Sequence, residues 1–278
     1  MIELPEVTLV CVDTRTPRLA LRAIARCTAG IRFGAVKLFT DRRGQELAPP
    51  GVSAIEAAIA SVPAYSDFML RGLSAHVATS HCLVVQWDGY VLDPARWEPG
   101  FLDWDYIGAP WRGIAGPRAV GNGGFSLRSR RLLDALRAPD IVVTHPEDVA
   151  ICRDNRDRLE RGGIRFAPVE VARRFAFERE APRGPTFGFH GLFNFDRVMP
   201  VTELRTLLDE MPAAMARGLD AHDLCRTLIA RGELDAAARI LAMRRELGMH
   251  DRRTLRLRLR HAWQRWRLGR RAPQLPTR

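Results

Sequence analysis

The stretch CLVVQWDGY, residues 82–90, changes from apolar to polar within a few residues. Its first four residues form a short apolar run that includes two valines, which is typical of a strand buried on both faces, as in a parallel sheet. Open α/β sheets bind ligands outside the carboxyl ends of their strands, and this pattern places Asp88 there. Gly89 then lets the backbone turn or approach a ligand closely. The stretch therefore predicts an α/β fold with Asp88 at its binding edge.

Strand and helix patterns alternate before this stretch. Strands are expected at 7–12 and 35–39, and helices at 19–27 and 65–77. A strand–helix–strand–helix–strand order predicts parallel strands joined by right-handed crossovers. The helix at 65–77 is expected to bury an apolar face formed by Phe68, Leu70, Leu73 and Val77.

Further elements follow Tyr90. GNGGFSLRSRRLLDAL, residues 121–136, predicts a glycine-rich turn, a short strand and a helix. A proline followed by two acidic residues at 146–148 favours the start of another helix. A strand is expected at 164–168, a glycine-spaced loop at 187–191 and helices over residues 200–248. The sequence thus predicts an α/β domain at about 1–200 and a helical region at 201–278.

Composition excludes several classes of protein. The five cysteines have no CxxC spacing, which favours reduced core residues over a zinc site or a disulfide framework. The N-terminal segment lacks the basic region of a signal peptide, and no apolar run approaches the roughly 18 residues of a membrane span. A cytoplasmic protein is therefore expected.

The charge is concentrated at the C-terminus. Residues 252–278 contain ten arginines and no lysine or acidic residue, which leaves +1 of the net +11 charge for residues 1–251. Leu255, Leu259, Trp263 and Trp266 repeat at helical spacing among these arginines. The segment Arg252–Arg270 predicts a basic amphipathic helix that binds an anionic membrane surface or a partner. The alternative is that its apolar side packs on the protein's own core.

Four polar features stand out, and each has a structural explanation. Asp88 could cap a turn, and His190 could be a hydrogen-bonded core histidine. Glu147-Asp148 could be favourable charge at a helix N-terminus, and the glycine-rich turn could be only a turn. Their order along the chain is more informative than any one of them.

That order resembles the plan of GT-A-type glycosyltransferases that use nucleotide sugars. More closely, the chain resembles a bacterial family of unknown function with this glycosyltransferase-like fold. The resemblance covers about residues 5–196 and is carried by VTLVCVDTR, YSDFMLRGL, VQWDGYVLDP, DYIGAPW, VGNGGFSLRSRRLL, PEDVAICR and FGFHGLFNF. It implies a GT-A-like, mostly parallel sheet flanked by helices.

The resemblance also implies roles for individual residues. Asp88 takes the place of the last carboxylate of the Asp-x-Asp motif, and His190 that of a late metal or phosphate ligand. Because the first position of the motif is Gln86, the dependence on Mn²⁺ or Mg²⁺ is left open. The general base of an inverting transfer corresponds to Asp148 with Glu147. The turn that shapes the acceptor side corresponds to Asn122, Gly123, Gly124 and Phe125.

Donor and acceptor contacts complete the expected site. The strand ends place Asp13, Thr14 and Asp41 beside the donor, together with Gln86 and Asp88, although turn formation explains the two strand-end aspartates equally well. Trp97 and Trp104 are expected in the core, or Trp104, Tyr106 and Trp111 form a sugar platform. Trp111 is the preferred acceptor contact because it follows a proline in a loop.

The expected function is transfer of a sugar from a nucleotide-diphosphate sugar to a glycan or lipid-linked acceptor. A UDP-sugar is the preferred donor, and the inner face of the membrane is the expected place of the reaction. The alternative is a non-catalytic nucleotide- or sugar-binding module of the same fold. Nucleic acid is not an expected partner, because the basic charge lies in one tail segment.

Overall fold

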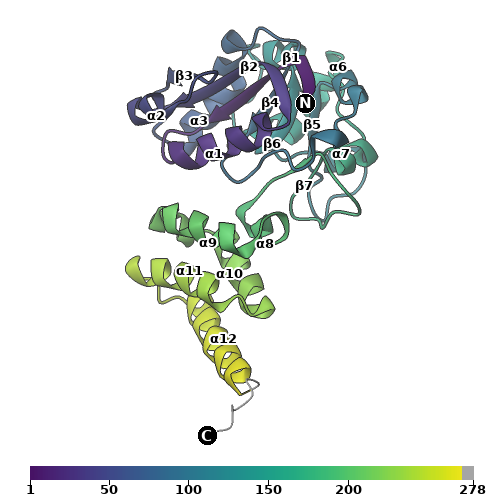
Figure 1. The fold of residues 1–278 in the computed structure, drawn as a ribbon. Coiled ribbons are helices and arrows are strands. Elements are labelled where there is room, and N and C mark those ends of the chain that lie inside the picture. The colour runs from purple at the N-terminus through teal and green to yellow at the C-terminus, as the bar shows by residue number, and fades with distance from the viewer. Residues whose placement is uncertain (271–278) are drawn as a thin grey trace, which may run out of the picture. The chain divides into compact units, whose positions relative to one another are not determined.

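Residues Met1–His190 form one compact part of the chain, here called unit 1. Its main sheet has six strands in the order β3-β2-β1-β4-β6-β5 (Figure 1). The structure is a computed structural model and describes residues 1–270. Strand β1 is parallel to β2 and β4, and β2 is parallel to β3. Strand β6 is antiparallel to both β4 and β5. The predicted α/β class and its mostly parallel sheet are therefore confirmed.

The strands and helices predicted before the glycine-rich turn occur in unit 1 in the expected order. The sheet strands are β1 (Ile2–Val12), β2 (Ile31–Thr40), β3 (Ser53–Glu56), β4 (His81–Val85), β5 (Tyr106–Gly108) and β6 (Phe125–Ser129). A second, two-stranded sheet pairs β7 (Ala176–Phe177) with β8 (Gly188–Phe189). The α-helices are α1 (Pro17–Thr28), α2 (Arg42–Leu47), α3 (Val62–Asp67), α4 (Arg130–Ala135), α5 (Glu147–Val149), α6 (Arg156–Arg161) and α7 (Val169–Phe175). The structure thus adds α2, β3, β5, α7, β7 and β8, which were not predicted.

The core of unit 1 lies on both faces of the central strand β4, all five residues of which are buried. Val84 on one face packs with Val10, Met69, Leu73 and Leu133. On β1, Cys11 points to the opposite face, where its buried thiol lies close to that of Cys27 in α1. Because both faces of β4 are covered, an uninterrupted apolar run is what this position requires.

Two predicted elements differ from the structure. The single helix expected at 65–77 is a succession of α3, a π-helical turn (Phe68–Gly72) and a 3₁₀ turn (Leu73–His76). The strand expected at 164–168 forms only one isolated bridge, between Phe166 and Tyr106. The Asp105 side chain accepts the Arg165 N–H at 2.7 Å, so this segment follows β5 without forming a regular strand.

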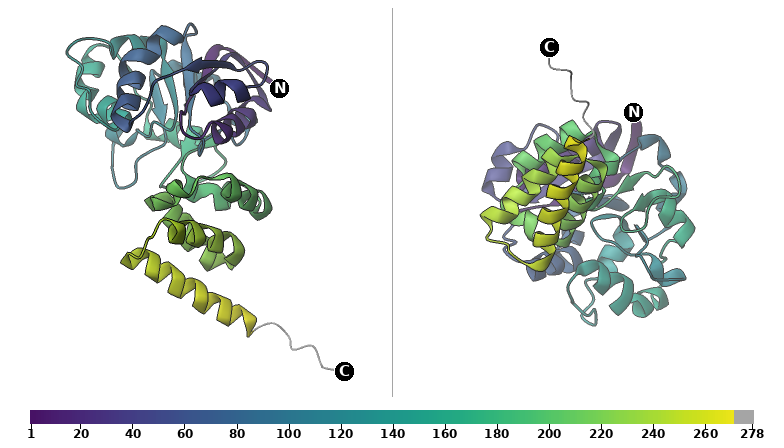
Figure 2. Two further views of the ribbon diagram at one scale, coloured as in Figure 1. Left: turned by 90° about the vertical axis from the view of Figure 1, so that its left-hand side faces the viewer. Right: turned by 90° about the horizontal axis from the view of Figure 1, so that it is seen from below.

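Residues Gly191–Arg278 form unit 2, which is helical as far as residue 270. Its helices are α8 (Phe195–Val198), α9 (Val201–Glu210), α10 (Leu219–Arg231), α11 (Leu234–Glu246) and α12 (Arg252–Gly269). Helix α10 packs on α11 and α12, and α11 packs on α9 and α12 (Figure 2). The chain divides at His190, earlier than the boundary expected at residue 200, and the assignment of roles to the two parts stays a prediction.

All five cysteines are buried with free thiols. Burial raises the pKa of Cys27 and of Cys82 to about 12, so both thiols stay protonated at neutral pH. No helix within residues 1–270 combines the length and the apolar character that a membrane crossing requires.

Candidate functional site

The candidate site lies at the edge of the sheet where β4 ends and β6 begins. Val85, the last residue of β4, pairs with Phe125, the first residue of the antiparallel β6. The polar residues that follow β4 therefore face the glycine-rich turn that precedes β6. Asp88 is 7% exposed within a turn closed by a bridge between Gln86 and Gly89. The predicted position of Asp88 at the carboxyl end of the central strand is confirmed.

His190 lies beside this turn, directly after β8. Its Nε2 atom is 3.1 Å from Oε1 of Gln86 and 3.4 Å from Oδ1 of Asp88. Its Nδ1 atom is 3.1 Å from Nδ2 of Asn122. The structure thus brings together four residues that the sequence placed in one site, although they come from three separate segments of the chain.

Asn122 decides which nitrogen of His190 carries a proton. Because Nδ2 of Asn122 donates to Nδ1, the proton of the neutral ring is on Nε2, which donates toward Gln86 and Asp88. Oδ1 of Asn122 is buried and has no hydrogen-bond partner among residues 1–270. If the amide rotates by half a turn, Oδ1 accepts a hydrogen bond from Nδ1–H, and the lone pair of the neutral ring is then on Nε2. The backbone of Asn122 is left-handed, with φ 56°, a conformation in which asparagine is enriched.

Two glycines allow the imidazole to lie this close to the backbone. A Cβ atom on Gly124 would overlap Nε2, Cδ2 and Cε1 of His190. A Cβ atom on Gly89 would lie 3.0 Å from Cδ2 of the same ring. Glycine at both positions is therefore a packing requirement of His190.

Glu147 and Asp148 are neighbours with different surroundings. Oε1 of Glu147 accepts a hydrogen bond from Nη2 of Arg128 at 3.0 Å, and both side chains of this ion pair are almost fully buried. Asp148 is half-buried, and its Oδ2 accepts the Gly123 N–H at 3.2 Å while Oδ1 accepts the Val149 N–H at 2.9 Å. Only Asp148 keeps a partly exposed carboxylate next to the glycine turn.

Arg128 is a site residue that the sequence reasoning did not single out. Besides Glu147, it donates to Oγ of Ser126 at 3.0 Å and to the Gly123 carbonyl at 3.3 Å. Burial acts to lower the pKa of Arg128, but neighbouring groups, including Glu147, raise it above its ordinary value, so the guanidinium stays charged. An arginine within a short predicted strand that also contains Phe125 and Leu127 was the signal available in the sequence.

Asp13 and Asp41 lie at the same edge of the sheet, Asp13 in the turn before α1 and Asp41 at the N-cap of α2. Oδ1 of Asp13 accepts the Thr16 N–H at 2.6 Å, before α1, and Oδ1 of Asp41 accepts the Gly44 N–H at 2.8 Å in α2. Thr14 donates its hydroxyl to the Ile59 carbonyl at 2.7 Å. The turn formation that the sequence allowed is therefore present, and donor binding by these three residues stays a prediction.

The aromatic stretch divides between core and edge. Tyr106 is fully buried, which excludes it from an exposed sugar platform. The Trp104 carbonyl lies 3.3 Å from Nε2 of His81, the first residue of β4, and so at the opposite end of that strand from Asp88. Trp111 is half-buried, packs against Gly121 of the glycine-rich turn and has the Arg153 guanidinium over its ring at 4.6 Å. Tyr106 supports the site from the core, since its hydroxyl donates to the Asn122 carbonyl at 3.1 Å, and Trp111 is the partly exposed aromatic residue beside the glycine-rich turn.

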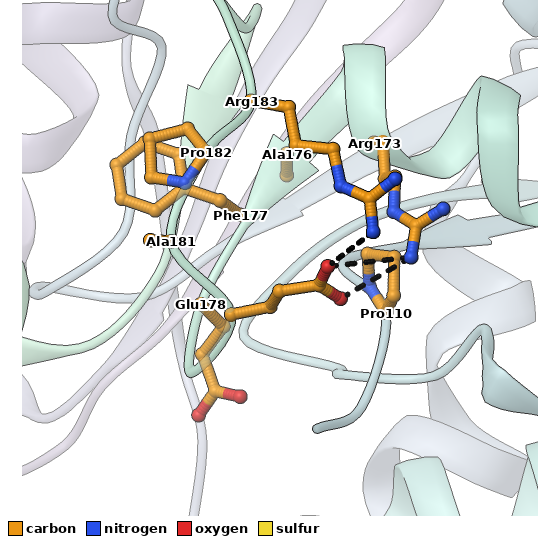
Figure 3. Close-up of a pocket in the computed structure, with 9 residues that line it drawn as sticks. Pro110, Arg173, Ala176, Phe177, Glu178, Ala181, Pro182 and Arg183 are labelled. Carbon is orange, nitrogen blue, oxygen red and sulfur yellow. Dashed lines mark hydrogen bonds and ion pairs between the residues drawn. The ribbon is translucent and has the colours of Figure 1, made fainter. Parts of the chain in front are cut away.

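A pocket lies next to the two-stranded sheet (Figure 3). Arg173 and Arg183 point into it, and both form ion pairs with Glu180. One residue of the pocket wall contacts the candidate site, since the Phe177 carbonyl accepts the His190 N–H at 3.0 Å. Its lining residues are Pro110, Arg173, Ala176, Phe177, Glu178, Glu180, Ala181, Pro182 and Arg183.

The site offers few ligands for a metal ion. Within residues 1–270, no three His, Cys, Asp or Glu side chains are grouped so that they could hold one. Asp88 and His190 supply one carboxylate and one imidazole nitrogen, and the unpartnered Oδ1 of Asn122 lies in the same cluster. Such a set fits a divalent cation whose remaining ligands come from substrate phosphates and water.

One comparison with known proteins identifies a family. The profile of a family described as "Protein of unknown function (DUF5672)" matches residues 52–190. A search of curated proteins gives no match.

Solved structures that are similar to the chain include a glycosyltransferase, a mannosyltransferase and a putative glucose-1-phosphate thymidylyltransferase. One acts in glycosylation of the major capsid of PBCV-1 (13% identity, 66% of this chain and 91% of that chain, TM-score 0.43). Another is an active-site mutant of LgtC (13%, 66% and 86%, TM-score 0.42). A third is the Pyrobaculum calidifontis mannosyltransferase PcManGT with GDP-Man and Mn²⁺ (11%, 94% and 81%, TM-score 0.42). These are distant likenesses that assign neither an activity nor a ligand to this chain.

Proposed function

The chain belongs to the DUF5672 family of proteins of unknown function, and we propose that it transfers a sugar from a nucleotide-diphosphate sugar to a hydroxyl acceptor. One observation carries the proposal: two carboxylates, Asp88 and Asp148, flank a single glycine-rich turn at the binding edge of the sheet. Asp88 is paired with an imidazole, whereas Asp148 is held by backbone N–H groups. One carboxylate can serve the donor while the other serves the acceptor.

On the donor side, the diphosphate brings negative charge to a site that already contains Asp88. A divalent cation, Mn²⁺ or Mg²⁺, would hold Asp88, His190 and the phosphates together and neutralise the charge of the leaving group. The nitrogen ligand favours Mn²⁺. Asp13 and Asp41 retain lone pairs beyond the hydrogen bonds that they accept within the protein, and these would accept hydrogen bonds from the ribose or base.

On the acceptor side, Asp148 is the proposed general base. Each of its oxygens accepts one backbone hydrogen bond, so lone pairs remain on both for an acceptor hydroxyl proton. Glu147 is fixed in its ion pair with Arg128, which also binds the Gly123 carbonyl, and so acts as a positioning residue for the turn. A sugar that stacks on Trp111 at the face covered by Arg153 has to displace that guanidinium.

A screen of nucleotide sugars, with Mn²⁺ and with a chelator, tests the proposal. We expect one donor class to bind selectively and Asp88→Asn to weaken its Mn²⁺-dependent binding by about tenfold or more. We expect Asp148→Asn to bind the donor normally and to lower the rate of transfer by about 10²–10⁴. Asp67→Asn, which changes an exposed carboxylate in a surface ion pair with Arg71, is the matched control.

The outcomes separate the alternatives. Donor binding that is unchanged in Asp88→Asn, with and without chelator, would remove Asp88 from the donor site. Selective donor binding without transfer to any hydroxyl acceptor would favour a non-catalytic binding module. The reduced motif Gln86-Trp87-Asp88 is the observation in favour of that second function, since only its last position offers a carboxylate.

A further inference from the structure

Helix α12 is fastened to unit 2 by a largely polar face. Its buried residues are Thr254, Leu257 and Gln264. Thr254 accepts a hydrogen bond from Nη1 of Arg244 in α11 at 3.0 Å, and Nε2 of His261 lies 3.0 Å from the Leu234 carbonyl. These contacts orient the helix about its own axis, so the direction of its other faces is fixed within unit 2.

The apolar stripe of α12 points away from this attachment. Leu255 is 45% exposed, Leu259 71%, Trp263 56% and Trp266 55%. Their spacing places them on one side of the helix, about half a turn from Leu257 and Gln264. Amphipathic helices normally bury such a stripe and expose polar residues. Helix α12 instead exposes its apolar stripe and buries Thr254 and Gln264. The stripe therefore does not pack on the core of unit 2.

Arginines flank the stripe on both sides. Eight of them lie between Arg252 and Arg270, and that range has no acidic residue. None of the eight forms a salt bridge with a carboxylate in the described part of the chain. The Arg267 guanidinium lies over the Trp263 ring at 5.0 Å, and that of Arg270 over the Trp266 ring at 4.0 Å. Arg271 and Arg278, the other two of the ten, lie outside the described residues.

We propose that this face of α12 binds an anionic lipid surface, with the helix axis parallel to the membrane. Charge complementarity selects the partner: eight unneutralised arginines match anionic headgroups, and the exposed leucines enter the boundary of the acyl chains. Tryptophan with a guanidinium over its ring suits the headgroup level. The helix is too polar to cross the membrane. This inference concerns a surface of unit 2 and does not depend on the proposed function.

Two other partners fit less well. A second copy of α12 would bring eight further arginines against the first eight, and their mutual repulsion opposes close packing. A nucleic acid would pair with the arginines through its phosphates but would leave Leu255 and Leu259 without an apolar partner. Only a surface that is both anionic and apolar satisfies the stripe and its flanks together.

Co-sedimentation of the full chain with vesicles tests the proposal. We expect binding to phosphatidylcholine vesicles that contain phosphatidylglycerol, release at high salt, and little binding to phosphatidylcholine alone. A stripe variant, Leu259→Ser with Trp263→Ser and Trp266→Ser, should bind the vesicles at least about tenfold more weakly than the original chain. Leu219→Ser, which changes a leucine that is 56% exposed on α10, is the matched control and should bind like the original chain.

A charge variant and two competing assays complete the test. Arg256→Gln with Arg260→Gln should weaken binding and its salt dependence while leaving the helix intact by circular dichroism. Equal vesicle binding by the stripe variant and the original chain would overturn the proposal, since charge alone would then account for adsorption. Self-association that the stripe variant abolishes, without vesicle binding, would identify a second copy instead. Tight DNA or RNA binding that the charge variant loses and the stripe variant keeps would identify a nucleic-acid surface instead.

Discussion

Two adjacent acidic residues in the candidate site have different physical situations. Glu147 is buried against the charged Arg128, whereas Asp148 stands at the half-exposed start of α5 and binds the turn backbone. A carboxylate in a buried ion pair is held by its partner and is poorly placed to take a proton. The same dipeptide thus supplies one group that fixes the turn and one that is available for chemistry.

Replacement of Glu147 should reveal this difference in stability. In Glu147→Gln, the buried Arg128 loses its counter-charge, and we expect the free energy of unfolding to fall by about 3–5 kcal/mol. Equilibrium unfolding in denaturant measures the change. Glu98→Gln is the control, because Glu98 pairs with Arg174 at the surface, where an ion pair contributes about 0–1 kcal/mol. Equal effects of the two substitutions would contradict the structural role of Glu147.

At the scale of elements, the site depends on the reversed direction of β6. Parallel strands alone would bring the ends of β1, β2 and β4 to one edge, with Asp13, Asp41 and Asp88. Because β6 runs antiparallel, its beginning meets the end of β4, and the glycine-rich turn lies under His190. The glycines remove the side-chain volume that would otherwise keep the imidazole from the backbone.

Alanine at Gly124 should disturb this packing. The added Cβ would overlap the His190 ring, so we expect the ring to leave Asp88 and the protein to lose about 1–3 kcal/mol of stability. Binding of the nucleotide-sugar donor should weaken with it. Gly184→Ala is the control, since nothing lies within 4 Å of its added Cβ. Thermal unfolding and donor titration measure both effects. A Gly124→Ala protein that matches the control in both would show that His190 does not need this contact.

At the scale of the whole molecule, the chain contains two units that each have a core. Leu83 is fully buried in the sheet of unit 1, and Leu228 is 1% exposed in α10 of unit 2. Folded units with separate cores can unfold separately. The net charge is divided unevenly between the units, since residues 252–278 of unit 2 carry +10 of the total of +11.

Differential scanning calorimetry should therefore show two transitions. Leu83→Ala and Leu228→Ala each leave a cavity that costs about 2–5 kcal/mol, and each should lower the midpoint of one transition only. The variants serve as controls for each other. One cooperative transition that both substitutions shift equally would show that the two units unfold together.

The sequence by itself determined the features that depend on neighbours along the chain. The apolar run at 82–85 specified a buried strand, polar residues at its end placed Asp88 at the carboxyl edge of the sheet, and helical spacing put Leu255, Leu259, Trp263 and Trp266 on one face. Local backbone preferences and the period of burial are written in short segments, so these predictions needed no knowledge of distant residues.

Only the tertiary structure decided which distant groups meet. The direction of β6, the ion pair of Arg128 with Glu147 and the contacts of His190 with Gln86, Asp88 and Asn122 all join separate segments. The spacing of the α12 stripe identified a face but not its surroundings, and the structure turned that face outward. The physical reason is that pairing between distant segments follows from the packing of the whole core, in which local propensities are a minor term.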